Sequence, residues 1–151
     1  MPLNQTSNRM KITIVPIQTL NIENDGFHLM TKGLINGIEA SFLIDTGASR
    51  TVFDQTVIRK FINDQEFEEN EKLSTGLGTN SMPSQVAYID CITLGELTIT
   101  DYTAIVIDLT HVHQSYQQLN LPDINCVLGG DILKKYKAVI NYKTKSMKLY
   151  Y

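Results

Sequence analysis

Apolar and polar residues alternate through residues 38–44, which is the pattern of a half-buried β-strand. Asn36 and Gly37 directly precede this strand and form the dipeptide most typical of a two-residue hairpin turn. Residues 27–34 lie on the other side of the turn and are predicted to be the partner strand. The sequence therefore predicts a hairpin whose second strand ends at Asp45.

Similar apolar segments recur along the rest of the chain and predict an all-β fold. In residues 11–20, Pro16 marks a bend or a sheet edge, because proline cannot donate a ladder hydrogen bond. The remaining predicted strands lie at residues 51–53, 85–92, 92–99, 102–108, 126–128, 138–142 and 147–151.

Three segments carry weaker, helical signals. Residues 55–62 have an apolar stripe after Asp54, which can cap the first turn of a helix. Residues 110–119 fit either a short helix or an irregular loop, since their periodicity is poor. Asp131 is expected to cap a helix over residues 132–136 by accepting its free N–H groups. We therefore expect one or two short helices beside the strands.

The composition fits one globular domain. The 151 residues are 42% hydrophobic and 19% charged, which supplies enough apolar surface for a single core. Residues 1–10 are polar and are predicted to be a flexible N-terminal arm. The folded domain is therefore expected at residues 11–151.

Charge and hydropathy exclude several classes of partner. The net charge is −3, and no cluster of Lys and Arg interleaved with aromatic residues provides a nucleic-acid surface. No apolar segment approaches the roughly 18 residues that span a membrane. The first ten residues lack the apolar core of a signal peptide. We therefore expect a cytoplasmic protein with no nucleic-acid partner and no membrane partner.

The candidate metal and redox residues are few. Cys91 and Cys126 stand beside hydrophobic residues without C-x-x-C spacing, so two buried free thiols are favoured over a disulfide or redox pair. His111 and His113 could face one side of an extended segment, but no third ligand with matching spacing lies nearby. No metal and no other cofactor is therefore expected.

The strongest chemical signal lies at residues 42–49, where three apolar residues end at Asp45, Thr46 and Gly47. This pattern predicts a buried strand that breaks into a tight turn, with Asp45 at the end of a rigid element. Gly47 permits backbone angles closed to other residues and lets a second chain approach closely. Taken alone, the triplet also fits a purely structural turn.

Residues 42–49 resemble the active-site motif of the aspartic proteases, in which two hydrophobic residues precede Asp-Thr-Gly and a small residue follows. A second match lies at residues 126–133, which resemble the hydrophobic-hydrophobic-Gly-x-Asp segment before the C-terminal helix of retropepsin-like domains. The resemblance to retropepsin-like aspartic proteases covers residues 11–151. One departure is Gly130, which stands where the viral enzymes typically carry arginine.

This resemblance implies a closed acid-protease β-barrel and the activity of an aspartic endopeptidase. Asp45 would be the catalytic residue, and Thr46 and Gly47 would support the active site. The resemblance also implies a set of substrate-binding residues, namely Gly47, Ala48, Gly76, Leu77 and Gly78. The last three belong to a glycine-rich segment that would close over the substrate as a flap, with a simple surface loop as the alternative.

The same resemblance implies a homodimer that cleaves a polypeptide. The family mechanism uses two facing aspartates, which share one proton because like charges at short range cannot both ionise. The chain has one Asp-Thr-Gly, at Asp45, and its 151 residues are about half of what a two-lobed enzyme needs. The second carboxylate must therefore come from a second copy of the chain.

Two other functions fit parts of the sequence. A non-catalytic peptide-binding or dimerisation module could keep the same fold without turnover, although the intact Asp-Thr-Gly argues against it. A sugar-kinase or actin-like ATPase also carries Asp-x-Gly after a strand. That fold needs two large lobes, and this chain is too short to hold them.

Overall fold

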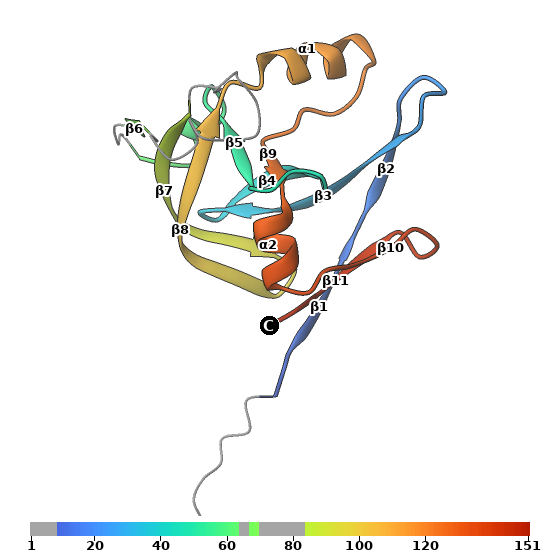
Figure 1. Cartoon of the computed structure of the whole chain (residues 1–151), viewed down its shortest axis with the longest axis vertical. Helices are drawn as coiled ribbons and strands as arrows, with labels where there is room; N and C mark the ends of the chain where they lie inside the picture. Colours follow the sequence, from blue (N-terminus) through green and yellow to red (C-terminus); the bar gives the residue numbers. More distant parts are fainter. Residues whose placement is uncertain (1–8, 64–66, 70–83) are drawn as a thin grey trace, which may run out of the picture.

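The computed structural model describes residues 9–63, 67–69 and 84–151, and most of them form β-structure (Figure 1). The strands in chain order are β1 (Ile12–Pro16), β2 (Gln18–Asn21), β3 (Phe27–Ile35), β4 (Ile38–Ile44), β5 (Val52–Asp54), β6 (Glu68–Glu69), β7 (Gln85–Leu94), β8 (Leu97–Ile107), β9 (Cys126–Leu128), β10 (Val139–Asn141) and β11 (Ser146–Tyr150). The described residues also form the helices α1 (Thr110–Gln118) and α2 (Gly130–Lys135) and the 3-10 turn η1 (Ile58–Lys60). The predicted all-β fold with one or two short α-helices is confirmed.

Six of these strands close into a barrel. The larger sheet runs in the order β2-β3-β4-β9-β5-β8-β7-β6, and an additional pairing between β3 and β7 joins its two sides. Closure encloses one face of each barrel strand, and the side chains of Phe42, Phe53, Ile89 and Leu128 are fully buried there. The closed barrel expected from the sequence is therefore confirmed.

The β3–β4 hairpin forms as its sequence predicts. Asn36 and Gly37 have positive φ angles of 49° and 79°, which a type I′ two-residue turn requires. At the other end of the hairpin, Leu29 pairs with Ile44. One difference is Ile38, which alternation assigns to the buried face but which is exposed beside the turn. The buried stripe of β4 thus begins at Ala40, the third residue after the turn.

β9 lies between β4 and β5, parallel to β4 and antiparallel to β5. Ile44 of β4 pairs with Leu128 of β9, so both strands end at the same edge of the barrel. Cys126 on β9 is buried, and burial raises the pKa of its thiol. Cys91 is partly buried, and both cysteines are free thiols as predicted.

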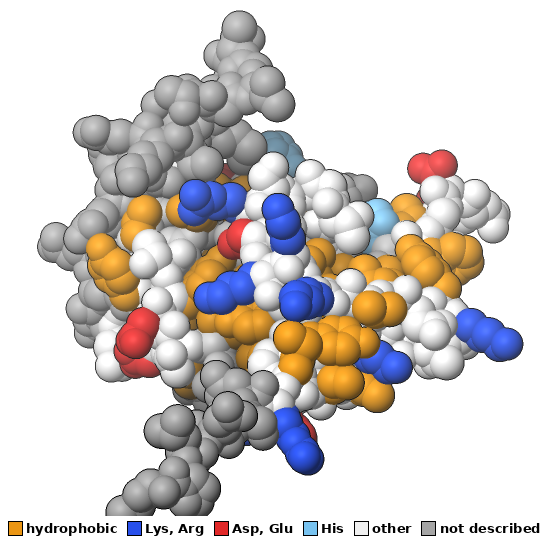
Figure 2. All heavy atoms as spheres, turned by 60° about the horizontal axis from the view of Figure 1, so that its bottom comes forward, with side chains coloured by type: hydrophobic (Ala, Val, Ile, Leu, Met, Phe, Trp, Pro, Cys, Tyr) orange, Lys and Arg blue, Asp and Glu red, His pale blue; other side chains and the backbone are white. Residues whose placement is uncertain are grey.

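β1, β11 and β10 form a separate three-stranded sheet in that order. Its inner face packs on the barrel core through Val15, Met147 and Leu149. Its outer face carries the exposed hydrophobic side chains of Ile12, Ile14 and Val139. Hydrophobic side chains also gather across the molecular surface at the bottom of Figure 1 (Figure 2). We call Ile12, Ile14 and Val139 the outer sheet face.

The prediction of a helix over residues 55–62 is wrong. Successive backbone hydrogen bonds there span three residues, from Lys60 N to Val57 O over 3.0 Å and from Phe61 N to Ile58 O over 2.9 Å. The segment therefore forms tight turns and the short η1. Thr56, Val57 and Ile58 are consecutive β-branched residues, which lower the helix propensity.

Asp54 still caps this segment, although it caps a turn. Its carboxylate accepts hydrogen bonds from Thr56 N over 3.1 Å and Val57 N over 3.2 Å. The other carboxylate oxygen accepts from Leu109 N over 2.9 Å. Asp54 is buried, so this one side chain joins the turn after β5 to the segment that leads into α1.

The structure also defines the elements predicted at residues 110–119 and around Gly95. Residues 110–119, which fit either a helix or a loop, form α1. The strands predicted around Gly95 extend into one long hairpin of β7 and β8, and Gly95 has a φ of 59° in its turn. Among the described residues, no helix is both long enough and apolar enough to cross a membrane.

Candidate active site

Asp45 directly follows β4 at the barrel edge where β9 also ends. Its N–H donates to Leu128 O over 3.0 Å, which continues the β4–β9 contact by one residue. The chain then turns: Ala48 N donates to Asp45 O over 3.2 Å, and Gly47 N donates to Asp45 Oδ1 over 2.9 Å. We call residues 45–48 the Asp45 turn. The predicted strand that breaks into a turn is confirmed, and Asp45 is exposed in the single chain.

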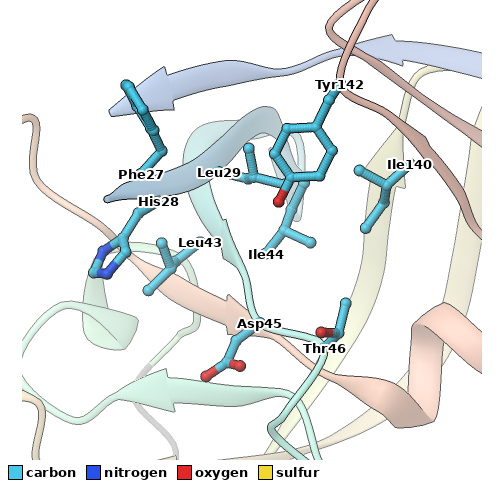
Figure 3. Close-up of a pocket in the computed structure, with 9 residues that line it drawn as sticks. All are labelled: Phe27, His28, Leu29, Leu43, Ile44, Asp45, Thr46, Ile140 and Tyr142. Carbon is cyan, nitrogen blue, oxygen red and sulfur yellow. The ribbon is translucent and has the colours of Figure 1, made fainter. Parts of the chain in front are cut away.

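A pocket of about 410 Å³ lies beside the Asp45 turn (Figure 3). Asp45 and Thr46 stand on one side and Tyr142 stands on the opposite side with Ile140 beside it, while Ile44 lies between the two sides. The full lining comprises Phe27, His28, Leu29, Leu43, Ile44, Asp45, Thr46, Ile140 and Tyr142. Most of these side chains are hydrophobic, but His28, Asp45 and Thr46 also line the pocket, so the carboxylate borders a surface that is part apolar and part polar.

His28 is a pocket residue that sequence reasoning missed. Its Nδ1 lies 2.6 Å from the hydroxyl of Tyr116, a buried residue of α1. Burial raises the pKa of the Tyr116 hydroxyl, so this group keeps its proton at neutral pH. The two residues are 88 positions apart, and no local pattern pairs them. The contact ties α1 to β3 beside the pocket.

The Asp45 turn is held from behind by the start of α2. Gly130 N donates to Ala48 O over 2.7 Å. Gly129 lies directly against the segment that follows the turn, and a Cβ atom built on it would stand 2.5 Å from Arg50 O. Glycine is therefore required at position 129, because any side chain would push the two segments apart.

The prediction that Asp131 caps its helix is wrong. The helix begins earlier, at Gly130, and no side chain caps it. Backbone oxygens satisfy its first N–H groups, as with Gly130 N and Ala48 O. Asp131 Oδ1 instead accepts from Thr51 N over 2.8 Å and from Thr51 Oγ1 over 2.7 Å. Its Oδ2 accepts from the Tyr102 hydroxyl over 2.8 Å.

These hydrogen bonds form a network around Thr51, which is fully buried. Thr51 Oγ1 also accepts from Gly129 N over 3.0 Å. Burial disfavours the charged form of Asp131, but the hydrogen bonds from Thr51 and Tyr102 outweigh it and lower the pKa of the carboxyl. Burial and the bond to Asp131 raise the pKa of the Tyr102 hydroxyl. Asp131 is therefore an ionised structural acceptor, and Thr51 and Tyr102 are partners that the sequence did not reveal.

The predicted site residues divide into two groups. Asp45, Thr46, Gly47 and Ala48 lie together in the Asp45 turn. The flap predicted at residues 76–78 lies outside the described residues and stays a prediction. In the described part of the chain, no group of three or more His, Cys, Asp or Glu side chains is arranged to hold a metal ion.

Comparisons with known proteins agree with this geometry. The sequence profile of the aspartyl protease family matches residues 31–132, a range that includes Asp45 and Asp131. No curated protein matches the chain by sequence. A retropepsin-like aspartic protease from Rickettsia conorii is similar in structure, with a TM-score of 0.58, 16% identity, and coverage of 94% of this chain and 90% of that chain. The EIAV protease, solved with the inhibitor HBY-793, gives a TM-score of 0.53 and 19% identity, with coverage of 81% and 99%.

A closed barrel with Asp-Thr-Gly after β4 and Gly-Gly-Asp after β9 defines the class of proteins with a retropepsin-like fold. The matched residues 31–132 run from within β3 to α2, and so contain most of the barrel. The chain belongs to the aspartyl protease family.

Proposed function

We propose that this protein is an aspartic endopeptidase that works as a homodimer, in which each copy supplies Asp45. The observation that carries the proposal is the position of the Asp45 carboxylate, which is exposed at the end of a barrel strand and lines a pocket. Within the described residues, this carboxylate accepts one hydrogen bond, from Gly47 N. No other described residue donates to it, so as far as the described residues go its remaining acceptor positions can bind water, substrate or a second carboxylate.

The dimer follows from the number of carboxylates that the reaction needs. The whole sequence contains one Asp-Thr-Gly, so one copy of residues 11–151 supplies half of a two-aspartate site. A two-fold axis beside Asp45 brings the same residue from a second copy to the same place. Thr46, adjacent to Asp45 and exposed, would brace the two turns across that axis.

In the proposed reaction, a water molecule lies between two Asp45 carboxylates that share one proton. The ionised carboxylate accepts a proton from the water as the water oxygen attacks the scissile carbonyl carbon. The protonated carboxylate donates its proton to the carbonyl oxygen. When the C–N bond breaks, the carboxylate that took the water's proton gives it to the leaving nitrogen, and the other recovers a proton from the hydroxyl of the intermediate.

The proposed substrate is an extended polypeptide with apolar side chains at the cleavage site. The hydrophobic side chains in the pocket lining, Leu29, Leu43, Ile44 and Ile140, support this class. The backbone at Gly47 and Ala48 would hydrogen-bond the peptide, and Gly76, Leu77 and Gly78 would close over it. The reaction needs no metal and no cofactor.

A mixing experiment tests the proposal most directly. Equal amounts of wild-type and Asp45→Asn chains exchange subunits fully, well above the dimer dissociation constant. Random pairing gives about a quarter wild-type, half mixed and a quarter mutant dimers. A mixed dimer faces one carboxylate with an amide, which cannot share a proton, so it should be inactive. Hydrolysis of an unfolded protein substrate, per wild-type chain, should fall to about half of the unmixed value.

The outcomes of this experiment separate the alternatives. A complete site in each copy would leave the activity per wild-type chain unchanged and would overturn the shared pair. A non-catalytic peptide-binding or dimerisation module would show no hydrolysis in any sample. Inhibition of the wild-type enzyme by pepstatin, a transition-state mimic of aspartic proteases, provides the control for contaminating proteases of other classes.

A further inference from the structure

The described surface carries two separate clusters of exposed or partly exposed hydrophobic side chains near the C-terminal hairpin. One is the outer sheet face of Ile12, Ile14 and Val139. The other borders the Asp45 pocket and comprises the exposed Phe27 and Tyr142 with the partly buried Ile140, which we call the pocket rim (Figure 3). The two clusters lie on opposite faces of the small sheet, because Ile140 and Val139 are successive residues of β10.

We infer that a second copy of this chain docks on the pocket rim, with Phe27 and Tyr142 as its main contacts, and that the outer sheet face stays in solvent. The inference rests on the proposed function, because it uses the second Asp45. Each carboxylate must reach one shared water over about 3 Å, so the two carboxylates lie within about 6 Å of each other. The residues next to Asp45 must therefore lie next to the second copy of the chain.

The pocket rim meets this condition and the outer sheet face does not. Phe27, Ile140 and Tyr142 line the same pocket as Asp45. Ile14 is on the face of β1 that points away from the barrel, as its buried neighbours Thr13 and Val15 show. A dimer built on the outer sheet face would keep the small sheet of each copy between the two aspartates.

The exposure of the rim side chains supports the same surface. Among the large hydrophobic side chains of the described residues, Tyr142 and Phe27 are the most exposed, at 66% and 64%. Aromatic residues that are exposed in one chain and buried on association carry much of the binding energy in protein interfaces. Two-fold symmetry uses each of them twice, so one contact buries four aromatic rings.

The position of β10 adds a further reason. This strand lies at the edge of its sheet, in the order β1-β11-β10, and its Ile140 belongs to the rim. An open edge beside an apolar surface is prone to pair with another chain unless it is covered. Docking on the rim also covers this edge, so the partner completes one wall of each substrate pocket.

The test measures dimerisation by sedimentation equilibrium in the full chain carrying Asp45→Asn, which prevents self-digestion and separates association from catalysis. Tyr142→Glu and Phe27→Glu place a charge on the rim and should raise the dimer dissociation constant at least 10- to 100-fold. Ile14→Glu, on a side chain 58% exposed on the outer sheet face, is the matched control and should change it less than about threefold. Phe27→Ser and Tyr142→Ser provide milder rim variants, and circular dichroism checks that each variant is folded.

The results distinguish this inference from the proposed function. If Ile14→Glu dissociates the dimer and both rim variants keep it, the pocket rim is not the interface. A shared pair of Asp45 carboxylates would then need a dimer of different geometry. A wild-type dimer that is broken by the rim variants but cleaves no polypeptide would support the interface and overturn the proposed function. A wild-type chain that cleaves as a monomer would overturn both.

Discussion

Asp45 and Asp131 follow neighbouring parallel strands, β4 and β9, yet their carboxylates have opposite surroundings. Asp45 is exposed, and the described hydrogen bond to its carboxylate comes from Gly47, two residues along the chain. Asp131 is half-buried and accepts from Thr51 and Tyr102, which lie 80 and 29 residues away. The first carboxylate is bound to its own turn, and the second joins three distant segments.

This difference separates two uses of one side chain. A carboxylate whose lone pairs are occupied by fixed donors stabilises the fold and stays ionised. A carboxylate with unoccupied lone pairs can accept a proton from a reacting group. Asp131 fixes Thr51, which follows the Asp45 turn, so the structural aspartate positions the backbone that carries the proposed catalytic aspartate.

The largest expected effect is the loss of hydrolysis in Asp45→Asn. The substitution keeps the size of the side chain and its bond from Gly47 but removes the group that exchanges protons. We expect a rate of polypeptide cleavage at least about 10²- to 10⁴-fold below wild type. Urea unfolding should change by less than about 0.5 kcal/mol, because the side chain is exposed. Undiminished cleavage by a pure Asp45→Asn sample would show that Asp45 is not the catalytic carboxylate of the two.

The second effect is a loss of stability in Asp131→Ala. This change leaves the N–H and hydroxyl of buried Thr51 and the hydroxyl of Tyr102 without their acceptor. We expect the free energy of unfolding, measured with urea, to fall by about 2–4 kcal/mol. The matched control is Asp123→Ala, at an exposed aspartate, which should cost less than about 0.5 kcal/mol. Equal urea midpoints for the two variants would contradict the structural role of Asp131.

A smaller effect is expected from Tyr102→Phe. The variant removes one donor to Asp131 Oδ2 and leaves both bonds from Thr51 in place. The free energy of unfolding should fall by about 1 kcal/mol. The double variant Tyr102→Phe with Asp131→Ala should lose less than the sum of the two single losses, because both remove the same bond. Simple additivity would mean that the hydroxyl contributes through other contacts.

The smallest effect is a dependence on pH. The folded-state pKa of Asp131 lies below its ordinary value of 3.8, because the hydrogen bonds from Thr51 and Tyr102 outweigh the effect of burial. Its contribution to stability is therefore present above that ordinary value and is lost as the pH falls through the folded-state value. In urea titrations from pH 6 to pH 3, the stability gap between wild type and Asp131→Asn should narrow. Parallel curves would exclude Asp131 as a source of the acid sensitivity.

The sequence predicted the Asp45 side of this comparison well, because that side is local. The alternation in residues 38–44 and the Asn36-Gly37 turn determine the hairpin, and the hairpin determines where the Asp45 turn begins. The all-β fold also followed from the pattern, since strands with one apolar face need a common core, whereas the closed barrel was implied by the resemblance to retropepsin-like proteases. Short-range periodicity carries this information directly.

The Asp131 side could not be predicted for a physical reason. An aspartate near the start of a short helix fits a cap, and the competing acceptor role depends on Thr51 and Tyr102. These residues come from other elements and reach Asp131 because the barrel closes. Their spacing in the sequence does not indicate this contact. The wrong helix prediction at residues 55–62 has a local cause. The apolar stripe there favoured a helix, but the run of β-branched residues lowers the helix propensity.

The pairing of β1 with β11 has a consequence for the time course of synthesis. Ile12 pairs with Tyr150 and Pro16 with Ser146, so β1 has no ladder partner in its sheet until about 130 further residues are made. At about 5–20 residues per second, that interval lasts about 7–26 s. The β3–β4 and β7–β8 hairpins need no such delay. The middle of the nascent chain can therefore fold first. During this interval the strand at residues 12–16 is unpaired and can bind chaperones or pair with other chains.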